Sequence, residues 1–186
     1  MTHTDPNIDR QIAALHIRAG SPADLRQRGG AIDWLLRHAD RSFPVVLARV
    51  EAQPHDLVLL DLLGRYRRPE ATPALLRAFG DPQTRLQAAS GLGLSPDPVA
   101  REALRRALDS TDPGDATAAL SGLGASGDAS ACADIVPRLQ SDSVEVRWMA
   151  VEIGARLGCL PRDTLEAISV DDPDARVRAL AASRLR

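Results

Sequence analysis

Alanine recurs at a fixed interval of 31 residues, at Ala88, Ala119, Ala150 and Ala181. The positions directly after these alanines are also small or aliphatic: Ala89, Leu120, Val151 and Ala182. A period in the low thirties built from such residues is typical of stacked helical hairpins, in which each unit buries its apolar face against its neighbours. The repeat therefore predicts that this chain of 186 residues has an all-α fold, a right-handed α-solenoid of about five to six helical hairpins.

The composition agrees with an aliphatic helical array. Hydrophobic residues make up 44% of the chain but aromatic residues only 3%, so the predicted core is built mainly from alanine and leucine, which are both good helix formers. The net charge of −2 disfavours a dedicated nucleic-acid-binding protein, which would need a strongly basic face.

Helix boundaries are predicted from turn residues. Each later unit opens with an Asp-rich turn that can cap a helix, and proline is favoured in the first helical turn; these turns are Asp81-Pro82, Asp112-Pro113, Ser141-Asp142 and Asp171-Asp172-Pro173. Glycine can end a helix in a left-handed conformation, so the first helix of a unit is expected to stop at Gly93, Gly124 and Gly158.

The repeat is clear in residues 56–186 and weaker upstream. Residues 31–55 predict one more hairpin, and residues 1–30 an N-terminal cap with an amphipathic helix over 7–18, followed by a looser segment at Ser21-Pro22. We expect a single domain over residues 1–186. The alanine column is expected to let paired helices approach closely, and Trp148, whose column also holds Leu86, Thr117 and Ala179, is expected to pack between units.

Val146-Arg147 with Ala150, and Val177-Arg178 with Ala181 and Ala182, recur at equivalent places of two successive units. These residues resemble the HEAT-repeat family, in particular the short repeats of the phycobilisome lyase-like group, whose units read Asp-Pro, a few residues, Val-Arg, two residues, Ala-Ala and Leu-Gly. The unit at Asp112 departs from that family pattern, since it has Asp115-Ala116 in the Val-Arg place.

The resemblance implies a non-catalytic scaffold or adaptor that binds another protein on its concave face. A partner with an acidic segment is one such protein. Two alternatives stay open. One is a nucleic-acid-binding protein resembling the alkyl-base DNA glycosylases, and the other is an accessory subunit resembling a bilin lyase. The shared residues are packing residues, so they predict a fold and no specific activity.

The candidate partner-binding site is a group of arginines on the second helices, which are expected to line the concave surface: Arg77, Arg101, Arg105, Arg106 and Arg138. An ordinary solvated face is the other interpretation of this group. A second set lies at the starts of the first helices and is expected to form a structural ladder between turns, with a ligand site as the alternative: Asp81, Arg85, Asp142, Arg147, Asp172 and Arg178.

Other motifs carry less weight. The glycines of residues 122–127 fit G-x-G-x-x-G, but a helix is expected before them, whereas the dinucleotide fingerprint needs a strand. Histidines His3, His16, His38 and His55 lack metal-ligand spacing, so no metal, cofactor or catalytic site is predicted. Cys132 and Cys159 are expected to be free thiols in a reducing compartment, and with no signal peptide or membrane helix apparent the expected location is cytoplasmic.

Overall fold

A computed structural model describes residues 5–18 and 20–186. These residues form helices and turns and contain no strand, which confirms the all-α prediction. The elements in chain order, with η marking 3₁₀ helices, are α1 Pro6–Leu15, α2 Pro22–Arg37, α3 Ala39–Ala52, α4 Leu57–Arg65, η1 Pro69–Ala71, α5 Thr72–Phe79, α6 Arg85–Leu94, α7 Pro98–Ala107, α8 Pro113–Ala125, η2 Ala129–Ala131, α9 Cys132–Ile135, η3 Val136–Gln140, α10 Val144–Arg156, α11 Arg162–Asp171 and α12 Ala175–Arg184.

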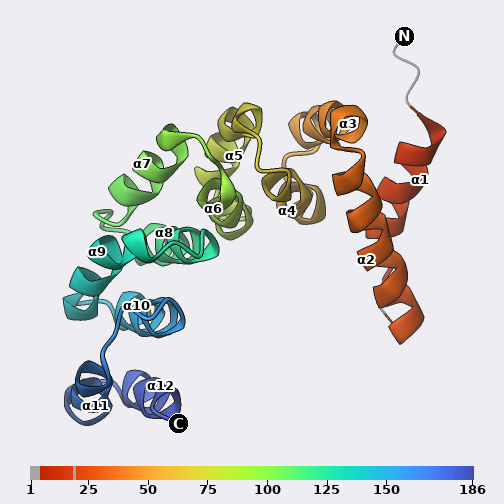
Figure 1. Ribbon diagram of the computed structural model, residues 1–186. Helices are drawn as coiled ribbons and strands as arrows, with labels where there is room; N and C mark the ends of the chain where they lie inside the picture. Colours follow the sequence, from red (N-terminus) through yellow and green to blue (C-terminus); the bar gives the residue numbers. More distant parts are fainter. Residues whose placement is uncertain (1–4, 19) are drawn as a thin grey trace.

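The helices follow one another along an arch with two layers (Figure 1). Helices α4, α6, α8, α10 and α12 form the inner layer on the hollow side, and α3, α5, α7, α9 and α11 lie outside them. Each inner helix packs against the next, since α6 contacts α4 and α8, and α10 contacts α8 and α12. The first helices of the predicted units are therefore the inner layer.

Capping residues explain where several helices begin. Asp56 and Asp112 cap α4 and α8, because their carboxylates accept hydrogen bonds from backbone N–H groups of the first turn. Ser21 caps α2 in a capping box with Asp24, whose carboxylate accepts from the Ser21 N–H. The expectation of a looser segment at Ser21-Pro22 was wrong, because this reciprocal cap starts a helix that continues to Arg37.

Two of the three glycines expected to end a helix have another role. Gly158 follows α10 with φ +75° and ends it as predicted. Gly93 and Gly124, however, lie inside α6 and α8. A Cβ on Gly93 would collide with the backbone of Gly122 on the neighbouring inner helix, so this glycine permits close helix packing and does not make a turn.

Glycine and alanine together form the seam of the inner layer. The Cα atoms of Gly64 on α4 and Gly91 on α6 face each other, and a Cβ on Gly122 of α8 would lie 2.5 Å from the carbonyl oxygen of Ala89. The four periodic alanines are fully buried beside these contacts, at Ala88, Ala119, Ala150 and Ala181. The inner helices from α4 to α8 thus touch almost backbone to backbone, which sets them on the shorter side of the arch.

Cys132 and Cys159 form a disulfide, with their Cα atoms 5.2 Å apart. The prediction of free thiols was wrong, because the two residues occupy non-equivalent repeat positions that the fold brings together: Cys132 begins α9, and Cys159 lies in the turn between α10 and α11. The expectation of a reducing compartment loses the support it drew from these residues. None of the described helices is long and apolar enough to cross a membrane.

Candidate interaction surface

The arginines of the predicted partner site lie on the outer layer. Arg77 belongs to α5, three others to α7 and Arg138 to η3, which follows α9. Because α5, α7 and α9 form the convex side of the arch, the prediction that the second helices line the concave surface was wrong (Figure 1). The physical reason is the glycine and alanine seam, which draws the first helices closer together than the second helices.

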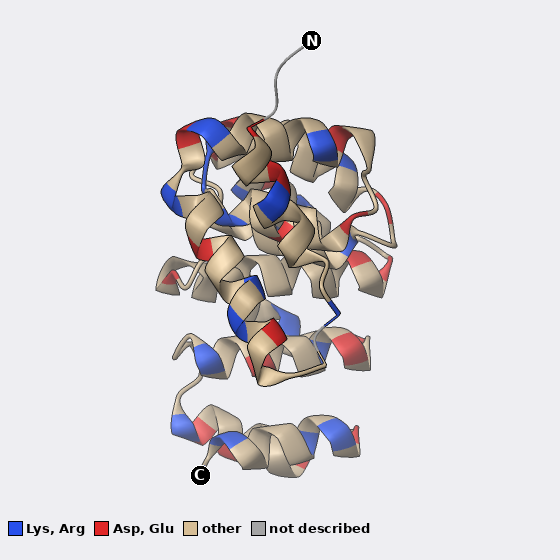
Figure 2. Ribbon diagram, turned by 90° about the vertical axis from the view of Figure 1, so that its right-hand side faces the viewer, with Lys and Arg blue, Asp and Glu red and all other residues tan. Residues whose placement is uncertain are grey.

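Each of these five arginines has a carboxylate partner. Four of the pairs link neighbouring units: Arg77–Glu51 at 3.0 Å, Arg101–Asp128 at 2.7 Å, Arg105–Asp134 at 2.9 Å and Arg138–Asp109 at 2.7 Å. Arg106 lies 3.7 Å from Glu102 on its own helix. The Arg101 guanidinium also lowers the pKa of Asp128, with the Ser130 N–H as a second donor. The charge of this row is therefore balanced, and basic and acidic residues are interspersed over the ribbon (Figure 2).

Two of the three ladder arginines, Arg85 and Arg147, pair with an aspartate of the following unit. Arg85 donates from Nη1 to Asp112 at 2.9 Å, and its Nε lies 3.0 Å from Asp115. Arg147 donates two hydrogen bonds to the Asp172 carboxylate, from Nε at 2.9 Å and from Nη2 at 3.1 Å. Both side chains of this last pair are less than one tenth exposed. These contacts place Arg85 and Arg147 in an inter-unit ladder.

Electrostatics in the ladder follow from these bonds. The Arg147 guanidinium lowers the pKa of Asp172 and, through the same bonds, its own pKa is raised. The pKa of Asp112 is lowered first by the Gly114 N–H and then by Arg85. These carboxylates are held in the charged form, as expected for capping and ion-pairing groups.

The remaining ladder residues behave differently. Asp142 contributes its backbone carbonyl to Arg147, and Arg178 makes the same type of contact with the carbonyls of Asp172 and Pro173. Asp81 accepts from His55 at 2.8 Å. His16 makes the same kind of contact with Asp56 at 2.8 Å. The sequence did not indicate that histidines pair with these turn aspartates, because a histidine in place of the arginine breaks the repeated Asp–Arg pattern.

Nδ1–H of His38 donates to the Trp34 carbonyl oxygen at 2.8 Å, and the His38 ring stacks on the Trp34 ring, whereas His3 lies outside the described residues. Among the described residues there is no group of three His, Cys, Asp or Glu side chains that could hold a metal ion. The glycines of the G-x-G-x-x-G pattern begin inside α8, so a helix precedes the turn at Gly127.

The inner layer carries a column of mostly apolar, mostly exposed residues, which we call the inner column. It consists of the same position on each inner helix: Leu57, Leu86, Thr117, Trp148 and Ala179. Leu57 is 41% exposed, Leu86 51% and Trp148 37%. The expectation that Trp148 packs between units was wrong, because the buried ladder arginine before it turns the next residue away from the neighbouring helices.

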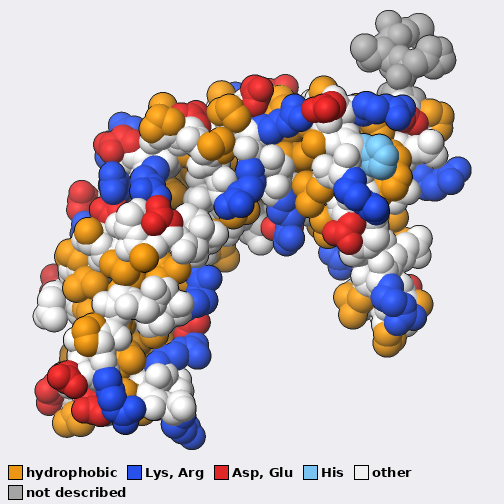
Figure 3. Space-filling view, viewed as in Figure 1, with side chains coloured by type: hydrophobic (Ala, Val, Ile, Leu, Met, Phe, Trp, Pro, Cys, Tyr) orange, Lys and Arg blue, Asp and Glu red, His pale blue; other side chains and the backbone are white. Residues whose placement is uncertain are grey.

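The inner column faces the hollow of the arch. The other sides of the inner helices contact either the next inner helix or the outer layer, so their exposed residues are left on the hollow side (Figure 3). One turn further along each helix the positions are polar; Ser183 is exposed and the other four are partly exposed, at Asp61, Ser90, Ser121 and Glu152. Asp61 is paired with Arg65 at 2.7 Å. Figure 3 also shows basic side chains along the hollow side, so this face joins an apolar line to charged and polar positions beside it.

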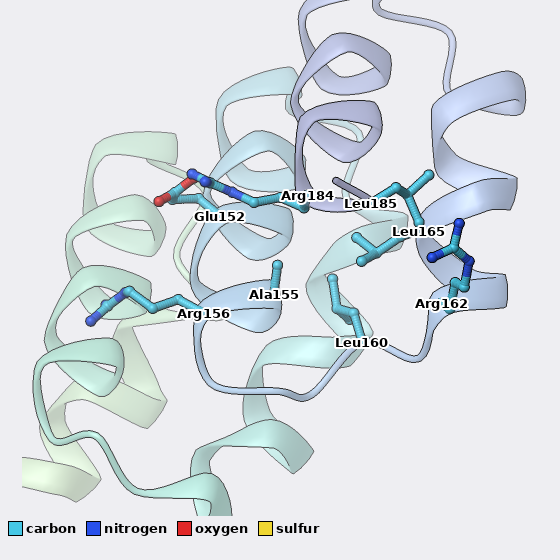
Figure 4. Close-up of a pocket in the computed structure, with 8 residues that line it drawn as sticks. All are labelled: Glu152, Ala155, Arg156, Leu160, Arg162, Leu165, Arg184 and Leu185. Carbon is cyan, nitrogen blue, oxygen red and sulfur yellow. The ribbon is translucent and has the colours of Figure 1, made fainter.

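A pocket of about 440 Å³ lies at the end of the arch, between α10, the turn that follows it, α11 and α12 (Figure 4). Its floor is apolar and its rim holds three arginines and one glutamate. We call it the terminal pocket; its residues are Glu152, Ala155, Arg156, Leu160, Arg162, Leu165, Arg184 and Leu185.

Comparison with models of known protein families and with curated protein sequences finds no match for this chain.

Proposed function

We propose that the chain is a right-handed α-solenoid of HEAT-like hairpins that acts without catalysis as a scaffold and binds a protein partner on its concave face. The observation that carries the proposal is the inner column, in which Leu57, Leu86 and Trp148 expose apolar surface at one repeated position. Aligned apolar exposure on a face otherwise free of large hydrophobic groups is typical of an interaction site.

The spacing of the inner column defines what can bind. Packed helices are separated by about 8–10 Å, so neighbouring positions of the column are separated by roughly this distance. An α-helix rises about 10.5 Å in seven residues, and an extended strand covers about 10 Å in three. A partner segment with an apolar residue at either interval can therefore place successive side chains on successive units.

The charges favour a protein partner over nucleic acid. Duplex binding needs cations that are free to replace counterions at the phosphates. The outer arginines are engaged with carboxylates of neighbouring units, and the positions beside the inner column bear acidic residues or serine. The net charge of −2 adds no long-range attraction for a polyanion.

The test compares two inner-column variants with a matched outer variant. Leu86→Glu and Trp148→Glu place a charge on the hollow side, and Val99→Glu does the same on the outer helix α7, where Val99 is 50% exposed. Tagged proteins would be used to capture partners from the host, and each captured protein would be purified and titrated against all variants by isothermal calorimetry.

We expect the two inner variants to lose binding at least tenfold and Val99→Glu to keep it. Equal binding by all three variants, or equal loss, would contradict the concave-face proposal. Gel mobility of the protein with duplex DNA at low and moderate salt tests the alternative class, since a salt-sensitive complex would favour nucleic acid as the partner.

A further inference from the structure

Helix α12 has one side that none of the described helices covers (Figure 1). In the earlier units the equivalent side packs against the next inner helix, since α6 contacts α8, α8 contacts α10 and α10 contacts α12. Val151 of α10 shows this burial, because it is 0% exposed and packs in one cluster with Val177 and Ala181 of α12. The uncovered side of α12 is therefore equivalent to the surface on which each earlier inner helix receives the next one.

Both helices of the α11–α12 hairpin expose residues whose equivalents are buried. Ala182 is exposed, but the residues at its position in the three preceding inner helices are all 0% exposed: Ala89, Leu120 and Val151. On the outer layer Val170 is 74% exposed, whereas Leu108, at the same position two units earlier, is 4% exposed. Together with the ladder arginine of α12 these residues form what we call the end surface, which consists of Val170, Arg178 and Ala182.

Arg178 gives the end surface a guanidinium group without a carboxylate partner. Its Nη1 donates to the backbone carbonyls of Asp172 and Pro173 at 2.7 and 3.1 Å. Arg147, 31 residues earlier, uses Nη1 in the same way on the two equivalent carbonyls, and it also donates from Nε and Nη2 to the Asp172 carboxylate. In the part of the chain that the structure describes, no carboxylate occupies the equivalent place beside Arg178. The Nε and Nη2 donors of Arg178 are therefore open to a carboxylate from outside.

The contact of Arg147 shows which group these donors fit. Asp172 stands in the turn before α12, where its Oδ1 also accepts a hydrogen bond from the Asp174 N–H at 2.8 Å. The aspartate is thus held by the backbone of the turn while both of its oxygens meet the guanidinium of the preceding unit. Such a two-bond contact between arginine and a carboxylate fixes orientation as well as charge. The matching group for Arg178 is an aspartate in the turn that leads into a helix.

We propose that the end surface docks a helical hairpin of a partner protein, in which an aspartate turn precedes the docking helix, so that the partner extends the array by one unit. The aspartate carboxylate meets Nε and Nη2 of Arg178, the docking helix lies over Ala182, and the second helix of the partner hairpin covers Val170. This surface is separate from the inner column, and the inference goes beyond the concave-face function.

A second copy of this chain does not offer such a hairpin. The aspartates in the turns before α4, α6, α8 and α12 already accept from side chains earlier in the chain; these pairs are Asp56 with His16, Asp81 with His55, Asp112 with Arg85, and Asp172 with Arg147. Helix α10, which follows the turn at Asp142, lies between α8 and α12. The carboxylate that fits Arg178 therefore belongs to another protein.

A peptide that copies residues 171–186 is the probe, because this segment contains α12 and its aspartate turn, which cover α10 in the protein. A side-chain cross-link across one turn holds the peptide helical, since a free helix of this length is marginal in water, and circular dichroism verifies the helix. A second peptide carries Asp172→Asn. Fluorescence polarisation measures the binding of each labelled peptide to the full chain. We expect the first peptide to bind with a Kd below about 1 mM, and less tightly as salt is raised, and the second to bind about tenfold more weakly.

The protein variants are Arg178→Glu and Ala182→Glu, with Arg106→Glu as the matched control for charge. Arg106 lies on α7 and is 71% exposed. Ala182→Glu keeps the backbone contacts of Arg178, so it tests the end surface even where Arg178→Glu loosens the start of α12. We expect both end-surface variants to weaken the first peptide about tenfold and Arg106→Glu to change its affinity less than about twofold.

Three results would overturn the inference: no binding of the first peptide up to about 1 mM, equal binding of the Asp172→Asn peptide, or unchanged binding in Ala182→Glu. Binding that is unchanged in Arg178→Glu would show that the peptide displaces α12 from Arg147, and would also overturn it. A dimer of the wild-type chain in sedimentation velocity that Ala182→Glu abolishes would assign the end surface to a second copy and would contradict the proposal. We expect Trp148→Glu to bind the first peptide as the wild-type protein does, so the end-surface and concave-face proposals can fail independently.

Discussion

The close packing of the inner helices predicts opposite effects for one substitution at two sites. A Cβ added at Gly122 would lie 2.5 Å from the Ala89 carbonyl oxygen and 2.9 Å from Cδ2 of Leu104. Close carbon–oxygen contacts in proteins are about 3.3 Å, so α8 would have to move from α6 by about 0.8 Å. The carbonyl belongs to a helix backbone and cannot rotate away.

The size of the effect follows from two opposing contributions. Overpacking of a buried contact costs about 1–3 kcal/mol, and a rigid backbone neighbour places Gly122→Ala near the upper end. Replacing glycine by alanine inside a helix stabilises it by about 1 kcal/mol. We therefore expect Gly122→Ala to lower the free energy of unfolding by about 2 kcal/mol, which corresponds to a fall in Tm of roughly 4–8 °C for a chain of this size.

Gly30→Ala is the matched control. Gly30 lies within α2, and a Cβ there has no atom within 4 Å, so only the helix contribution remains. We expect this variant to raise the free energy of unfolding by about 1 kcal/mol and Tm by roughly 2–4 °C. Circular-dichroism melts and urea titrations of both variants measure the difference. Equal shifts of the two variants, or a Gly122→Ala protein as stable as the wild type, would refute the proposed backbone contact.

Three further predictions concern the ladder and the disulfide. Asp172→Asn should lower the free energy of unfolding by about 3 kcal/mol, because it leaves Arg147 buried without its carboxylate, whereas Asp109→Asn at a 73% exposed carboxylate should change it by less than about 1 kcal/mol in the same urea titration. Since the pKa of Asp172 is lowered in the folded state, its contribution to the free energy of unfolding is complete above the unfolded pKa of about 3.9 and is lost as pH falls through the folded pKa. Melts from pH 6 to pH 2 should therefore show a smaller loss of stability in Asp172→Asn than in the wild-type protein. Parallel curves of stability against pH for the two proteins would contradict this. Reduction of the Cys132–Cys159 disulfide, which spans 27 residues, should cost about 3 kcal/mol and lower Tm, while a double Cys→Ser variant should be insensitive to reductant; identical melts of the wild-type protein with and without reductant would argue against a stabilising bond.

The sequence predicted where the helices lie in the chain better than which helices line the hollow of the arch. The period of Ala88, Ala119, Ala150 and Ala181 identified a buried position in every unit, since repeated burial imposes the same small residue each time. Which layer faces the hollow was not predictable from the period, because it depends on the relative width of the inner and outer layers. That width is set by contacts such as Gly64 with Gly91, between residues of different units.

The candidate site was missed for a related reason. Trp148 and Leu86 share a column, and a shared column was taken as a sign of packing, but the same repetition also aligns exposed residues. Leu86 and Trp148 directly follow the ladder arginines Arg85 and Arg147, and this position was the available sign that they are exposed. Cys132 and Cys159 gave none, because they differ in repeat position and meet only through the turn that follows α10.

The backbone contacts of the inner helices also set the breadth of the arch. Glycine at Gly64, Gly91 and Gly122 keeps α4, α6 and α8 near the smallest separation that helices allow. At Ile153, which stands 31 residues after Gly122, the same position holds a large side chain, which packs against Gly124 of α8. The side-chain volume at the position of Gly122 and Ile153 therefore influences the curvature of the arch. Larger residues there separate the inner helices, straighten the arch and increase the distance between its two ends. The width of the hollow is in this way set by residues that do not line it.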